Sequence, residues 1–96
     1  MEFLIRRSDG DWFSLARADF SVALRPTNFA SAPCEGWGDH RIKLSNGTIA
    51  FSYEDPGIQV IFKDFSGNAD EVRQIVEEIL ANIEFVTRQK GSIVEL

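Results

Sequence analysis

Three residues near the middle of the chain have side chains of the types that covalent catalysis requires. Cys34 and His40 are the only cysteine and histidine in the sequence, and Asp39 directly precedes His40. A nucleophilic cysteine needs a base beside it and a third group that orients the base. Catalytic partners usually come from separate segments, however, and this spacing matches no established signature. We therefore favour structural roles, with Cys34 packed as a small apolar residue and His40 at the start of a strand. The alternative is a small hydrolase or transferase that uses Cys34 with His40.

The same segment gives no support for a metal or a cofactor. Structural zinc is usually held by four ligands, mostly Cys and His, and one of each is too few. Gly36 and Gly38 do not form a phosphate-binding loop, because no lysine follows them and no helix pattern begins there. The neighbouring carboxylates Glu54 and Asp55 precede a Pro-Gly pair and are typical of a turn, whereas a catalytic pair must face each other. We expect no cofactor and no metal site.

Trp37 is the strongest candidate for a binding residue. It stands between two glycines in residues 25–40, a stretch rich in proline, glycine and small polar residues. This composition opposes both helix and central strand, and a loop this long in a small domain is often functional. An exposed Trp is a favoured anchor in protein interfaces. The alternative is that Trp37 folds back over the open end of the sheet.

A second candidate surface lies in the C-terminal third of the chain. Asp70, Glu77 and Glu84 fall close together on the face of a predicted helix opposite its apolar residues. Such a face attracts a basic protein partner, although a solvated face partly paired with Arg73 is the simpler interpretation. Phe85 projects off the apolar stripe, so we expect either the C-terminal tail or another molecule to cover it.

The helix that carries these residues has the clearest pattern in the sequence. Asn68 is a good N-cap with Glu71 three residues later, and Gly91 is the expected stop, so the helix covers about residues 68–90. Residues 92–96 then add a short edge strand or fray. The apolar residues recur at helical spacing and predict a stripe that packs on a sheet. They are Val72, Ile75, Val76, Ile79, Leu80, Ile83 and Val86.

The middle of the chain predicts a β-hairpin and a third strand. Residues 41–44 and 48–53 alternate between apolar and polar side chains on either side of Asn46-Gly47. An Asn-Gly pair between alternating runs is the strongest short-range hairpin signal, because both residues tolerate positive φ. Residues 58–63 form the next strand, and their continuous apolar run predicts a central position covered on both faces.

The N-terminal part predicts further strands. Residues 2–7 alternate and form the first of them, and the Asp-Gly pair at 9–10 predicts a tight turn. Residues 12–15 then pair back as a second, shorter strand. Residues 19–24 also alternate and predict a strand, with a short helix over 14–20 as the alternative.

These patterns together predict one α+β domain over residues 1–96. Its antiparallel sheet has about five strands, largely a meander, and packs on the long C-terminal helix. The net charge of −5 arises entirely in residues 49–96. Because the sequence has no basic stripe, nucleic acid and anionic membranes are poor partners. A single cysteine excludes an internal disulfide, and no signal-peptide or membrane-spanning pattern is present, so we expect a cytoplasmic protein.

The expected function is that of a small, soluble, acidic module that binds or inhibits another protein without catalysis. No catalytic set can be assembled from residues this sparse, whereas Trp37 and the helix face offer contact surface. Small acidic proteins of this size and layout include inhibitor and immunity proteins, an analogy of size and charge alone. A monomer is favoured over a homodimer, in which the C-terminal tail would pair with a second copy.

Overall fold

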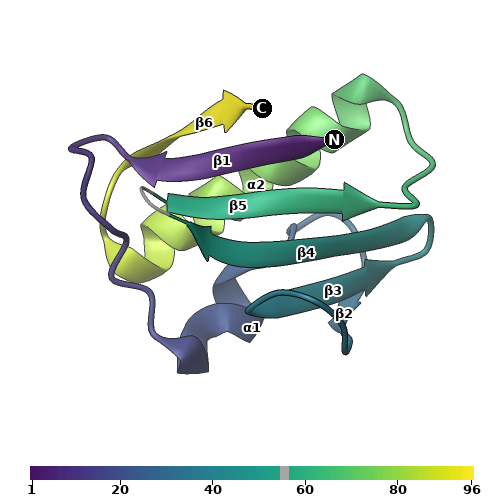
Figure 1. Cartoon of the computed structure of the whole chain (residues 1–96), viewed down its shortest axis with the longest axis horizontal. Helices are drawn as coiled ribbons and strands as arrows, with labels where there is room; N and C mark the ends of the chain where they lie inside the picture. Colours follow the sequence, from purple (N-terminus) through teal and green to yellow (C-terminus); the bar gives the residue numbers. More distant parts are fainter. Residues whose placement is uncertain (55–56) are drawn as a thin grey trace.

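Antiparallel strands form one sheet, and a long helix lies across one of its faces (Figure 1). The computed structural model describes residues 1–54 and 57–96, and within these the sheet has six strands in the order β2-β3-β4-β5-β1-β6. They are β1 (Glu2–Arg7), β2 (Ser31–Pro33), β3 (His40–Leu44), β4 (Gly47–Glu54), β5 (Gly57–Lys63) and β6 (Gly91–Glu95). The long helix is α2 (Ala69–Thr87), and a 3₁₀ turn, η1 (Arg17–Asp19), leads into a short helix, α1 (Phe20–Ala23). The predicted α+β class is confirmed, with six strands instead of about five.

Strands β2 to β5 follow one another as a meander, and β1 and β6 complete the sheet beyond β5. This arrangement makes the predicted strand at residues 12–15 wrong. The turn after β1 forms, with Gly10 at φ +81° and its N–H bonded to the Arg7 carbonyl. Both edges of β1 are already occupied, however, by β5 and β6. Residues 12–15 therefore leave the sheet, and their alternation instead buries Phe13 and Leu15 in the core.

The predicted strand at residues 19–24 is also wrong, because this segment is helical. Phe20, Ala23 and Leu24 are buried, which is the i, i+3, i+4 spacing of a helix. Val22, which a strand would have turned inward with Phe20, is 55% exposed. The short helix considered as the alternative over residues 14–20 is present in part, because η1 and α1 together span residues 17–23.

The core lies between α2 and one face of the sheet. The predicted helix stripe is confirmed: five of its residues are fully buried, and Leu80 and Val86 are partly buried against them. Strand β5 is central as predicted, but α2 covers only one of its faces. Val60 and Phe62 point toward the helix and are buried, whereas Ile61 points away and stays partly exposed. The expected cover on both faces is therefore wrong.

The ends of α2 differ in how well the sequence predicted them. Asn68 is the N-cap, and its side chain accepts a hydrogen bond of 2.8 Å from the Glu71 N–H. At the other end the helix stops at Thr87, because Arg88 adopts a left-handed conformation with φ +59°. Gly91 is therefore not the stop; it is the first residue of β6.

The hairpin between β3 and β4 forms, with one correction to its turn. Leu44 pairs with Gly47, which leaves Ser45 and Asn46 at the tip. Gly47 has a positive φ of +150°, as predicted, but Asn46 does not. Instead Asn46 fastens the turn to the segment after β5, through hydrogen bonds of 2.7 and 2.8 Å with Ser66. The second predicted turn falls partly on residues 55 and 56, which lie outside the described residues.

The C-terminal tail forms a strand within its own chain. In β6, Ile93 lies opposite Ile5 of β1, and the Leu96 N–H donates to the Glu2 carbonyl. Of the two alternatives for residues 92–96, a short edge strand or a frayed end, the structure has the strand, over residues 91–95. The tail does not cover Phe85, whose side chain is 71% exposed, so that part of the expectation is wrong.

Candidate functional site

The loop between β2 and β3 presents Trp37 on a base that is held on both sides. At its start the Cys34 N–H donates to the Arg41 carbonyl at 2.9 Å. At its end the Asp39 N–H donates to the Phe51 carbonyl at 2.8 Å, and the Asp39 carboxylate accepts from the Tyr53 N–H at 2.8 Å. Only residues 35–38 project beyond these bonds. The Trp37 side chain is 57% exposed and so does not fold back into the core.

The glycines on either side of Trp37 are required by the shape of this loop. Gly38 has φ +109°, and a Cβ there would lie 2.7 Å from the Phe51 carbonyl oxygen. Gly36 has φ +153°, and a Cβ there would lie 2.5 Å from Cδ of Arg41. Both conformations are rare for residues with a side chain. The glycines therefore set the path that carries Trp37 outward and bring the loop against Arg41.

The preceding part of the irregular stretch is fastened to α2. The Glu78 carboxylate accepts hydrogen bonds from the Thr27 N–H, the Asn28 N–H and the Asn28 side chain at 2.7–2.9 Å. Burial alone would raise the pKa of Glu78, but these bonds together outweigh it and hold that pKa below its ordinary value. The Asn82 side chain also donates to the Arg25 carbonyl at 2.7 Å. Residues 25–28 are thus anchored to the helix and support the next strand.

The structure does not bring Cys34 and His40 together as a nucleophile and its base. Cys34 lies opposite Arg41, and residues directly opposite in an antiparallel pair share a face, so Cys34 lies on the face away from α2. His40 points to the other face, where its ring contacts Phe20 and Phe51 at centroid distances of 5.8 and 6.0 Å. Among the described residues no hydrogen bond joins the two side chains, and Nε2 of His40 is buried without a partner.

Burial of His40 predicts that the protein loses stability on mild acidification. Burial lowers the pKa of His40 below its ordinary value of 6.5. The unfolded chain therefore binds the proton first, so stability is complete above pH 6.5 and falls as the pH drops toward the lowered pKa. We expect the free energy of unfolding, measured by urea titration, to decrease from pH 7.5 to pH 5.5.

His40→Gln is the control for this effect, because the chain contains no other histidine. The variant should show a flat profile over the same pH range. The carboxylates with lowered pKa values, Asp9 and Glu78, titrate below this range and do not interfere. An undiminished slope in His40→Gln would contradict the assignment.

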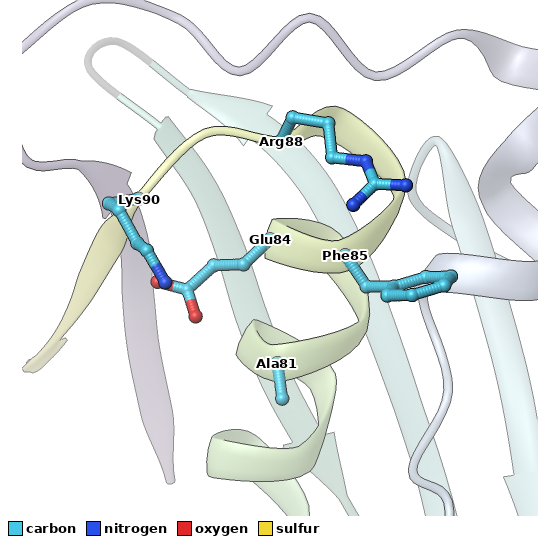
Figure 2. A pocket seen from close by; sticks show the side chains of 5 residues that line it. All are labelled: Ala81, Glu84, Phe85, Arg88 and Lys90. Atoms are coloured by element: carbon cyan, nitrogen blue, oxygen red, sulfur yellow. The ribbon is translucent and has the colours of Figure 1, made fainter.

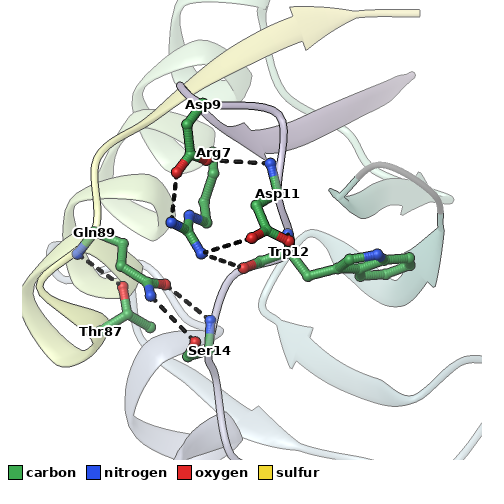
Figure 3. Close-up of polar contacts among 7 residues, drawn as sticks. All are labelled: Arg7, Asp9, Asp11, Trp12, Ser14, Thr87 and Gln89. Carbon is green, nitrogen blue, oxygen red and sulfur yellow. Dashed lines mark hydrogen bonds and ion pairs between the residues drawn. The ribbon is translucent and has the colours of Figure 1, made fainter.

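The second exposed tryptophan, Trp12, belongs to a polar network that holds the N-terminal segment (Figure 3). Arg7 donates to the Trp12 carbonyl at 2.8 Å and pairs with Asp9 at 2.6 Å. The Asp11 N–H and the Arg7 guanidinium hold the pKa of Asp9 below its ordinary value. The Trp12 ring lies 6.1 Å from the Tyr53 ring and is 43% exposed. Trp12 thus packs against its own chain more than Trp37 does.

Phe85 lines an open hollow near the end of α2 (Figure 2). The hollow has a volume of about 400 Å³ and is also lined by Ala81, Glu84, Arg88 and Lys90. The Arg88 guanidinium lies 5.2 Å from the centre of the Phe85 ring, a cation–π contact. The hollow lies at the end of α2 and its lining combines one aromatic ring with charged groups of both signs, so it defines no particular ligand.

The acidic residues of α2 are partly engaged within the chain. Glu77 pairs with Arg73 at 3.5 Å, and Glu84 accepts from the Gly91 N–H at 3.0 Å. The predicted pairing of Arg73 with Glu77 is therefore present. Asp70 is exposed in the first turn of the helix, so the three residues do not act as one unoccupied acidic surface.

Neither a metal site nor a membrane span emerges from the described part of the chain. Within residues 1–54 and 57–96, no three His, Cys, Asp or Glu side chains gather closely enough to hold a metal ion. None of the helices described there is both long and apolar enough to cross a membrane.

Comparison with known proteins identifies no relative from which function could be transferred. No protein family matches the chain, and no curated protein or solved structure is significantly similar to it. Function must therefore be inferred from the residues themselves.

Proposed function

We propose that this chain is a non-catalytic protein-binding module of the inhibitor type that engages its partner through Trp37. The observation that carries this proposal is the exposure of Trp37 on a loop held at both ends by backbone hydrogen bonds. Tryptophan is enriched among the residues that dominate binding energy. A loop that is already ordered loses little conformational entropy on binding, so more of the contact energy appears as affinity.

The alternative function, a cysteine-dependent hydrolase or transferase, has weaker support. Its nucleophile and base would have to meet, yet Cys34 and His40 lie on opposite faces of the sheet. Burial lowers the pKa of His40, which disfavours the imidazolium that would stabilise a thiolate. The single cysteine fits a reducing compartment, and we place the module in the cytoplasm.

A basic partner on the acidic face of α2 is the second binding mode considered. It has less support than Trp37, because Glu77 and Glu84 already contact groups of their own chain. Asp70 alone would provide little attraction, since single exposed ion pairs contribute at most about 1 kcal/mol.

The proposal predicts that Trp37→Ala abolishes partner capture without unfolding the domain. Immobilised wild-type protein, Trp37→Ala and Trp12→Ala would be exposed to a lysate of the source organism, and bound proteins quantified by mass spectrometry. We expect the wild type to capture a protein whose captured amount falls at least about tenfold with Trp37→Ala. The reason is that interface tryptophans often contribute more than about 1.4 kcal/mol to binding. Circular dichroism would confirm that each variant is folded.

Trp12→Ala is the matched control, since it removes the other exposed tryptophan, and it should retain capture. Cys34→Ser should also retain it. Equal capture by Trp37→Ala and the wild type would overturn the proposed site. Loss of a measurable hydrolase or transferase activity in folded Cys34→Ser would instead support the enzymatic alternative.

A further inference from the structure

The face of the sheet opposite α2 is not covered by any described element (Figure 1). Strand register identifies its side chains, because alternate residues point to opposite faces. In β3, Ile42 and Leu44 point into the core, so Arg41 and Lys43 point to this open face. In β5, Phe62 points into the core and Lys63 points outward.

Three cations gather at one end of this open face. Lys43 and Lys63 both lie opposite Thr48 of β4, one on each side, so they are two strand spacings or about 10 Å apart. Arg41 lies two residues from Lys43, about 7 Å along the same strand, and donates to the Thr48 hydroxyl at 3.2 Å. Among the described residues none of the three takes part in an ion pair. We call Arg41, Lys43 and Lys63 the basic patch.

The basic patch stands out because the chain as a whole has a net charge of −5. Strand register also places two carboxylates, Glu2 and Glu54, on the open face. Glu2 of β1 lies opposite Ile61, two residues from Lys63 along β5, and its carboxylate accepts a hydrogen bond from the Gln59 side chain. Glu54 is at the other end of β4 from Thr48. At this end of the face three cations therefore stand against one carboxylate, so the local charge is positive and steers an anionic partner.

The basic patch adjoins the loop that carries Trp37. Gly36 lies against the aliphatic part of Arg41, since a Cβ on it would meet Cδ of that side chain at 2.5 Å. The loop that carries Trp37 therefore contacts the basic patch at Arg41. Aromatic and Arg side chains are enriched in protein interfaces.

We infer that the partner of this module presents an acidic protein segment to the surface formed by Trp37 and the basic patch. The inference rests on the proposed function and names the chemistry of its partner. Carboxylates complement the patch, and a segment of limited length avoids the acidic remainder of the chain. A nucleic acid is less suitable, because its phosphates continue beyond about 10 Å, the span of the patch, and would meet that acidic remainder.

The test uses a fluorescein-labelled peptide in which Glu residues alternate with spacer residues other than Trp. Its binding is measured by fluorescence anisotropy at low and at moderate salt concentration. Wild-type protein should bind the peptide, and added salt should weaken the binding. The double variant Lys43→Gln/Lys63→Gln should bind at least about tenfold more weakly, because two exposed ion pairs of a few-fold each are lost. The control Arg73→Gln/Lys90→Gln removes the same charge from the helix side and should bind like the wild type.

Three results would overturn the inference. The first is no peptide binding by the wild type, and the second is equal weakening in both double variants, which reflects net charge alone. The third is tighter binding of a single-stranded oligonucleotide of equal charge, which would make nucleic acid the partner. Failure of the proposed function would give a different result, namely partner capture that does not depend on Trp37.

Discussion

Ile79→Ala is expected to lower the free energy of unfolding by about 2–5 kcal/mol, the usual cost of emptying a buried aliphatic site. Ile79 lies near the middle of α2, is 0% exposed, and points into the core between helix and sheet. A domain of this kind is stable by only about 5–15 kcal/mol, so this loss is a large share. Urea denaturation of the variant and the wild type measures it directly.

Phe85→Ala is the matched control for this prediction. Phe85 is on the same helix and has a larger side chain, but it is 71% exposed. Its replacement should change stability by less than about 1 kcal/mol, because exposed substitutions remove little buried surface. If Ile79→Ala unfolds at the same urea concentration as the wild type, α2 is not docked on the sheet as described.

Gly47→Val is expected to destabilise the protein by about 1–3 kcal/mol from backbone strain alone. Gly47 has φ +150°, and a Cβ on it would lie 2.7 Å from the Phe65 Cα and 3.0 Å from the Asp64 carbonyl oxygen. These neighbours are backbone atoms, so they cannot move aside as a flexible side chain would. The steric conflict therefore adds to the strain.

Gly10→Val distinguishes the two contributions. Gly10 also has positive φ, at +81°, but nothing lies within 4 Å of the position of its Cβ. This variant should cost less than Gly47→Val, because it carries strain without a collision. A neutral Gly47→Val would show that the turn between β3 and β4 lies elsewhere and that the strand register is wrong.

Local signals in the sequence predicted the elements that most determine the fold. The spacing of apolar residues in α2 and the cap at Asn68 depend only on neighbours along the helix, and both are confirmed. The hairpin around Gly47 is likewise a short-range feature. Such elements can be read from a sequence because the interactions that specify them lie within a few residues.

The errors arose where distant segments decide the outcome. Residues 12–15 have a strand pattern, but the place beside β1 that they would need is taken by β6, which comes from the other end of the chain. Residues 19–24 are so short that alternation and helical spacing fit them almost equally. The left-handed Arg88 ends α2 although its residue type gives no such signal.

The candidate site was predictable in part. Trp37 stood out because of its flanking glycines, but its exposure depends on hydrogen bonds between Asp39 and β4 that no local pattern reveals. The basic patch was missed because charges were compared between halves of the sequence. Its members, Arg41, Lys43 and Lys63, come together only when strand register places them on one face.

The measurement that tests the proposed function most directly is the affinity of the purified partner for wild-type protein, Trp37→Ala and Trp12→Ala. Isothermal titration calorimetry gives each Kd, and circular dichroism confirms folding. We expect Trp37→Ala to weaken binding by at least about 30-fold, which corresponds to the roughly 2 kcal/mol that defines a dominant interface residue. Trp12→Ala should stay within about threefold of the wild type, since it lies outside the proposed contact. A folded Trp37→Ala that binds the partner with wild-type affinity would contradict the account.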